Sequence, residues 1–218
     1  MSPQLVWARR LTWLAVFGAA LGAIGDTLLL YVPTGFYEDP EMAFMASIGG
    51  DRLLAGHLLG VLAIPLQAGG LWLVWHALRP AGLKLANWAV VTGVYVVAIG
   101  TATHALFYPA AEAARIGPEK VAEVKSFLDP VAGLFVLGFF VLFGIVVILI
   151  LRGKTPLPKW TALVTPISFY LVSILFYIAI PLVGNFLIPA AFNLGMMVFF
   201  LILLLVPWRS TAIATASQ

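Results

Sequence analysis

The chain has 218 residues, of which 62% are hydrophobic and only 10% are charged, and its formal net charge is +3. Soluble domains carry about 45–50% apolar and about 25% charged residues, so this composition excludes a water-exposed globular protein and indicates an integral membrane protein. The absence of cysteine excludes disulfide bonds, thiolate catalysis and cysteine metal ligands. The small positive charge does not indicate a nucleic-acid partner, and the length suits one transmembrane domain over residues 1–218.

Six apolar stretches are long enough to cross a membrane. Each can span a layer of about 30 Å at about 1.5 Å per residue, and each is predicted to be a helix because lipid offers the backbone no hydrogen-bond partner. The first follows the basic pair Arg9–Arg10 and is too long for the apolar part of a signal peptide, so we interpret it as a retained helix. The predicted fold class is an all-α bundle with transmembrane spans at about 11–32, 53–78, 87–108, 130–151, 161–182 and 186–207.

The charges between the spans predict the orientation. Of the 12 lysines and arginines, all but Arg52, Arg115, Lys120 and Lys125 fall in the two terminal segments and the second and fourth connections, which contain no acidic residue. By the positive-inside rule these segments are cytoplasmic. The prediction is a multi-pass protein of a bacterial cytoplasmic membrane with both termini inside. Every acidic residue except Asp26 then falls in an outer segment.

Two outer connections are predicted to contain short amphipathic helices that lie on the membrane surface. In DPEMAFMASI, Asp39 is a good N-cap and Pro40 suits the first helical position. In GPEKVAEVKSFL, Pro118 has the same place, and apolar residues recur along one helix face.

The two halves of the chain resemble each other at a shift of 78 residues. The shift aligns Pro40–Glu41 with Pro118–Glu119 and needs no gap. We interpret spans 1–2 and 3–4 as parallel repeats and spans 5–6 as a third hairpin without an outer helix, the alternative being a chance match among many glycines and prolines. The further matches are Asp51 with Asp129, Gly22 with Gly100, Gly60 with Gly138, and Pro80 with Pro158.

The same shift aligns Asp26 with His104. Each follows a glycine by four residues, Gly22 or Gly100, and so shares that glycine's face of the helix. Small residues mark close helix contacts in membranes, and Gly18 with Gly22 forms a GxxxG motif. We therefore expect Asp26 and His104 to face the bundle interior and, if the repeats pack about a pseudo-twofold axis, to face each other.

Polar side chains of several spans fall at one level, in the predicted outer half of the membrane. His76 lies nineteen residues after His57 on the same span, about 28 Å away, and is excluded from any shared site. The primary candidates, for ligand binding or for catalysis, are Asp26, His57 and His104. Further ligand-binding candidates are Arg52, Asp129 and Asn193, with aromatic walls from Tyr31, Phe36, Tyr37, Phe107 and Tyr108.

Three roles are compatible with these residues. They can lock the helices together, because a buried carboxylate is costly unless paired. They can form the polar end of a pocket for a small amphiphile or membrane lipid. They can also be catalytic, as metal ligands or as an Asp–His general base, although no HExxH-type motif is present. We favour binding or sensing of an amphiphile, with no cofactor and no metal, and leave enzymatic activity open. The sequence does not determine the oligomeric state.

Two other functions follow from local patterns. GDTLLLYVP, followed by AGHLLG, resembles the GD-x-L-L-L stretch and downstream histidine of the lysoplasmalogenase family of membrane hydrolases. The resemblance implies a lipid hydrolase with Asp26 and His57 in its active site, whereas the whole chain is similar to uncharacterised bacterial six-helix membrane proteins. A small transporter or membrane-complex subunit is a third possibility, because transporters use repeats and proline-broken helices. IPLQAGG, with Pro65, is the candidate unwound segment, although we favour a simple packing kink.

Overall fold

The computed structural model describes residues 2–33 and 42–208, and this part of the chain is helical, with no β-strand. The α-helices are α1 Pro3–Leu30, α2 Gly50–Ala63, α3 Ala68–Leu78, α4 Leu83–Ile116, α5 Pro118–Leu151, α6 Pro166–Ala179 and α7 Pro181–Leu205. Short 3₁₀ helices are η2 Ala43–Ser47, η3 Ile64–Gln67, η4 Arg79–Ala81 and η5 Lys159–Leu163.

Several helices are long and apolar enough to cross a membrane, as expected of a multi-pass protein. They are α1, α4, α5, α7 and the stretch Gly50–Ala81, in which α2, η3, α3 and η4 follow one another. The fifth predicted span, 161–182, differs. The longest helix within it is the 14-residue α6, which is about 21 Å long. Thr165 caps its first turn, Pro166 begins it, and the chain turns again at Pro181.

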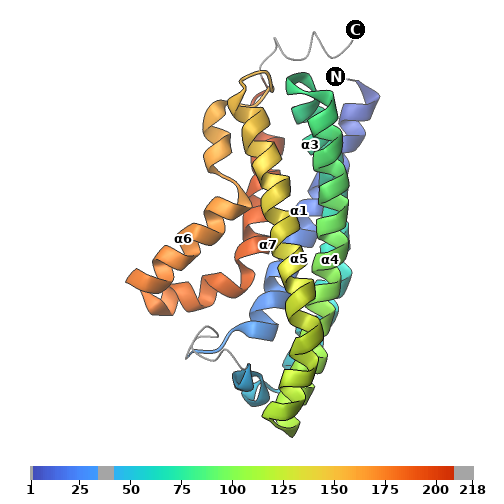
Figure 1. The fold of residues 1–218 in the computed structure, drawn as a ribbon. Helices are drawn as coiled ribbons and strands as arrows, with labels where there is room; N and C mark the ends of the chain where they lie inside the picture. Colours follow the sequence, from blue (N-terminus) through green and yellow to red (C-terminus); the bar gives the residue numbers. More distant parts are fainter. Residues whose placement is uncertain (1, 34–41, 209–218) are drawn as a thin grey trace.

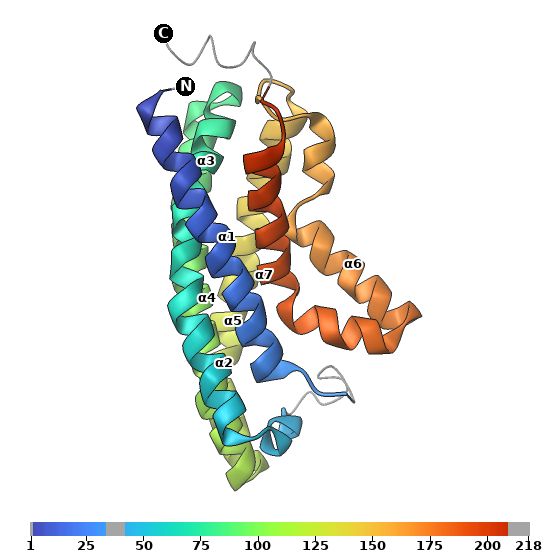
Figure 2. The same ribbon diagram turned by 180° about the vertical axis from the view of Figure 1, so that it is seen from behind.

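The helix α6 and the first turns of α7 form a hairpin that leans away from the other helices, as both views show (Figures 1 and 2). The helix α7 then bends and runs along the bundle beside α1. The bend follows from Pro189, the proline inside α7, because proline has no N–H to bond the carbonyl four residues earlier. One wall of the bundle is therefore set at an angle to the rest.

The helices α4 and α5 pack along each other as a long hairpin, each 34 residues or about 51 Å. They join at Gly117, whose φ of 152° lies in the region that favours glycine. The predicted separate surface helix after Pro118 is wrong, because these residues form the first turns of α5, which continues through Pro130. A proline removes only one backbone hydrogen bond, and packing against α4 holds the helix together.

The connection between α1 and α2 contains η2, and its residue Met45 is fully buried against the part of the α4–α5 hairpin near Gly117. The predicted cap residues Asp39 and Pro40 lie outside the described residues. The described part of the predicted surface helix is thus a 3₁₀ turn packed in an apolar cluster rather than an amphipathic α-helix lying on a membrane surface.

Glycines allow α1 and α2 to approach closely. A Cβ atom built on Gly25 would lie 2.9 Å from the carbonyl oxygen of Gly56, and one on Gly56 would lie 2.9 Å from that of Gly25. Such contacts are typical of small-residue helix interfaces in membranes.

At one end of the bundle, Arg9 donates a hydrogen bond to the carbonyl of Leu204, so the start of α1 and the end of α7 lie together. Which side of the membrane this end faces, and the repeat relationship, stay predictions.

Candidate functional site

Asp26 of α1 and His104 of α4 meet inside the bundle. His104 Nδ1 lies 3.1 Å from Asp26 Oδ1, and the two residues are 3% and 8% exposed, respectively. The expected contact between these two positions is therefore present. The other ring nitrogen, His104 Nε2, lies 3.1 Å from the carbonyl oxygen of Gly56. Gly60 makes room for the ring, because a Cβ atom at this position would overlap it.

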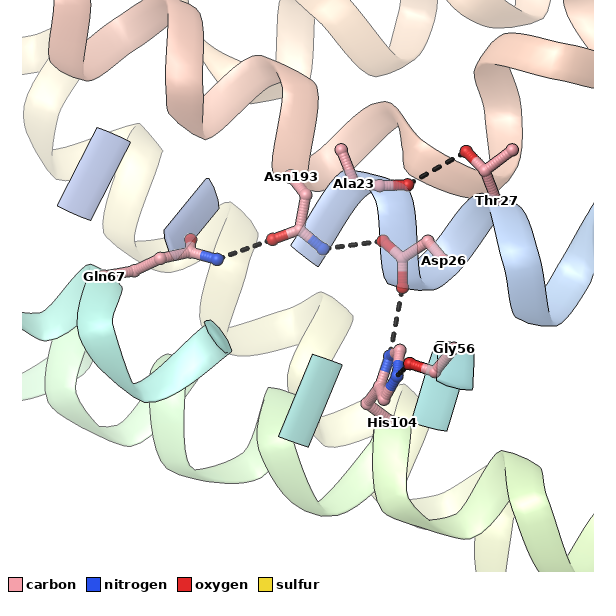
Figure 3. Close-up of polar contacts among 7 residues, drawn as sticks. All are labelled: Ala23, Asp26, Thr27, Gly56, Gln67, His104 and Asn193. Atoms are coloured by element: carbon pink, nitrogen blue, oxygen red, sulfur yellow. Dashed lines mark hydrogen bonds and ion pairs between the residues drawn. The ribbon is translucent and has the colours of Figure 1, made fainter. Parts of the chain in front are cut away.

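Two amides extend this contact into a chain of side-chain hydrogen bonds (Figure 3). Asn193 of α7 donates from Nδ2 to Asp26 Oδ2 at 2.6 Å, and its Oδ1 accepts from Gln67 Nε2 of η3 at 2.6 Å. Gly22 leaves space for the Asn193 amide, since a Cβ atom there would lie 2.8 Å from Asn193 Oδ1. The order Gln67–Asn193–Asp26–His104 is called the polar chain below.

The polar chain fixes the number of protons on the Asp26–His104 pair. Gly56 offers His104 Nε2 only an acceptor, so this nitrogen carries a hydrogen. The Nδ1 atom faces a carboxyl oxygen, and that contact also requires a hydrogen, on one partner or the other. The pair therefore holds one shared proton and is electrically neutral in total, whether it is written as two ions or as two neutral groups.

The polar chain lines part of a cavity of about 250 Å³. The rest of the wall is mostly apolar, and its other polar side chains are Thr103 and Tyr170. Val136 of α5 contributes to the wall and is 36% exposed, so the wall borders the bundle surface at this residue. The rings in the wall are Phe107, Phe135, Phe139, Tyr170 and Phe192, and Tyr170 stacks on Phe192 with ring centroids 4.7 Å apart.

Three of the candidates from the sequence do not line this cavity. Arg52 donates to the carbonyls of Thr27, at 3.1 Å, and Tyr31, so its guanidinium satisfies the C-terminal end of α1. Asp129 is 62% exposed in its side chain, 3.7 Å from Lys125. A common level in the membrane does not specify the face of a helix, and these two side chains point elsewhere.

His57 is the third candidate outside the cavity. Its ring packs against Tyr108, with centroids 5.2 Å apart, and its Nδ1 is buried without a hydrogen-bond partner in the described part of the chain. No group of three or more His, Cys, Asp or Glu side chains that could hold a metal ion occurs within residues 2–33 and 42–208.

The expected aromatic wall is present in part. Phe107 lines the cavity, whereas Tyr31 packs against Phe186 and Tyr108 against His57. The other two expected rings, Phe36 and Tyr37, lie outside the described residues.

Gln67 was not among the predicted site residues. It follows Pro65, and the 3₁₀ turn of η3 changes the rotation between α2 and α3, so helical spacing from His57 or Gly60 does not give its direction. One feature of the sequence could have identified it. Gln67 is an amide within an apolar span, where it is buried, and a buried amide needs a hydrogen-bond partner.

Comparison with known proteins identifies a family but no activity. No curated protein and no solved structure matches the chain. A family model described as a family of unknown function, DUF6796, matches residues 1–210. Because this match covers nearly the whole sequence, the chain belongs to the DUF6796 family.

Proposed function

We propose that this protein binds or senses a small amphiphile or membrane lipid in the cavity lined by the polar chain. The observation that carries the proposal is the combination of a mostly apolar, ring-rich wall with one connected group of polar side chains. Ligand sites typically combine apolar walls with a few polar groups that orient the ligand. We place the protein in a bacterial cytoplasmic membrane with both termini inside, on the charge distribution.

The geometry favours binding over hydrolysis. A general-base histidine needs one ring nitrogen free to accept a proton from water or a nucleophile. Both nitrogens of His104 are engaged, one by Asp26 and one by the Gly56 carbonyl. His57, which the lysoplasmalogenase resemblance implies, is not in the wall of the cavity.

The geometry also favours binding over transport. A permeation route would need polar groups toward the end of the bundle where α1 begins and α7 ends. Much of the described interior there is instead a tight apolar cluster that includes Leu73, Phe143, Phe199 and Leu203, each at most 1% exposed. Closely packed apolar side chains leave no path for a polar solute.

The test is equilibrium binding of ten-carbon amphiphiles to the purified protein in lipid nanodiscs. The panel is decanol, decanoate, decylammonium and decane, each radiolabelled. Val136→Trp places a large side chain in the wall of the cavity, and Leu137→Trp places the same side chain on the neighbouring residue, which is 61% exposed and not in the wall.

We expect saturable binding of at least one panel member to the unaltered protein and to Leu137→Trp, and its loss in Val136→Trp. Lipid partitioning is not saturable and does not distinguish the two variants. The proposal is refuted if no panel member binds saturably, or if both tryptophan variants bind equally well.

A further inference from the structure

We infer that the cavity selects an amphiphile with a hydroxyl head over one with an anionic, cationic or purely apolar end. This inference rests on the proposed function and names the ligand class. It comes from the hydrogen-bonding capacity and charge of the polar chain in the wall of the cavity.

The polar chain retains both an acceptor and a donor after its internal bonds are made. Each Asp26 oxygen accepts one hydrogen bond, from His104 or Asn193, and a carboxylate oxygen can accept a second. The Nδ2 of Asn193 and the Nε2 of Gln67 each use one hydrogen in the chain, and an amide nitrogen carries two. A hydroxyl group donates one hydrogen bond and accepts others, so it can use both capacities together.

An amphiphile with a charged head group does not suit the polar chain. Among the described residues that form the wall, none is lysine or arginine, and the Asp26–His104 pair is neutral in total. An anionic head would therefore lie beside a carboxyl group without a compensating cation. A cationic head would compete with the proton shared by His104 and Asp26. In either case an unpaired charge is buried among apolar side chains, which is costly.

The cavity volume limits the part of the ligand that is enclosed. An apolar cavity of about 150 Å³ can hold benzene, so a cavity of about 250 Å³ can hold roughly ten non-hydrogen atoms. A longer tail would leave beside Val136, where the wall is partly exposed. The rings of Phe135, Phe139 and Phe192 suit an aliphatic or flat cyclic body next to the hydroxyl group.

The panel described above tests this selection when the affinities are ranked. We expect decanol to bind at least about tenfold more tightly than decanoate, measured where the carboxylate is ionised, or decylammonium. We also expect decanol to bind more tightly than decane, because decane leaves the polar chain without a partner in the ligand.

Gln67→Leu removes one donor at the end of the polar chain. We expect this variant to lose part of the preference for decanol over decane, compared as the ratio of the two affinities within the variant, because Asp26 and Asn193 keep their capacities. Saturable binding of decane shows that the variant is folded. If Val136→Trp does not fold, displacement of labelled decanol by unlabelled decanol still shows a saturable site.

The outcomes separate the two proposals. Cavity-dependent binding in which decanoate, decylammonium or decane equals decanol overturns the hydroxyl selection and leaves the proposed function standing. An unchanged decanol preference in Gln67→Leu also overturns the selection as argued, because the hydroxyl group then makes no use of the Gln67 donor. The absence of saturable binding by all four compounds overturns both.

Discussion

Replacing Asp26 by asparagine or by alanine tests the proton count in the polar chain. Asparagine has nearly the same shape, and its oxygen can accept from Asn193 as Asp26 Oδ2 does. Its amide nitrogen can donate to His104 Nδ1, while His104 Nε2 keeps its hydrogen bond to Gly56. The variant Asp26→Asn therefore lacks the proton that Asp26 and His104 share. It still leaves each member of the polar chain with its hydrogen-bond partner.

Alanine gives the opposite result. Asp26→Ala leaves Asn193 Nδ2 and His104 Nδ1 without their partners in a buried site. Each unsatisfied group costs about 1–3 kcal/mol, so we expect a loss of about 2–6 kcal/mol in the free energy of unfolding. For Asp26→Asn we expect a change within about 1 kcal/mol, because no polar atom is abandoned.

The assay is reversible unfolding in mixed micelles of a mild detergent and dodecyl sulfate, followed by circular dichroism, with all three proteins measured side by side. A loss in Asp26→Asn as large as that in Asp26→Ala would refute the reasoning. The charge of Asp26, rather than the pattern of donors and acceptors, would then stabilise the site.

Three other predictions test separate parts of the structure. Arg52→Met should lower the unfolding free energy by about 1–3 kcal/mol, since it frees carbonyls at the end of α1, but leave amphiphile affinity unchanged because Arg52 does not line the cavity. Gly60→Ala should cost about 1–3 kcal/mol by displacing the His104 ring, whereas Gly144→Ala, whose Cβ meets nothing within 4 Å, should be neutral or stabilising in the same titration. The chain has no cysteine, so single cysteines report orientation: in intact cells an impermeant maleimide should label Ser126→Cys and spare Lys84→Cys, and the reverse would refute the predicted topology.

The sequence predicted the contact between Asp26 and His104 because both lie in regular helices. Four-residue spacing from a glycine fixes a face, and the 78-residue shift pairs the two faces. Gln67 escaped this reasoning because η3 interrupts the helical period between it and His57.

Membrane depth alone was a poor guide to the other site residues. Arg52 has a long side chain that reaches the end of α1, and Asp129 lies on the exposed side of α5, although both were predicted at the same level as Asp26. Two helix lengths were also underestimated. The predicted span 87–108 stops just before Pro109 and the span 130–151 starts at Pro130, yet α4 and α5 continue through these prolines because the two helices support each other along their length.

The polar chain also has a consequence for assembly of the bundle. In lipid, apolar side chains distinguish poorly between one rotation or depth of a helix and another, since lipid tails are as apolar as leucine. Asp26, Gln67, His104 and Asn193 come from four separate segments. A turn or slide of any one segment breaks at least one of their bonds. The polar chain thus specifies the arrangement of the helices mainly by destabilising misassembled bundles, and less by adding stability to the correct one.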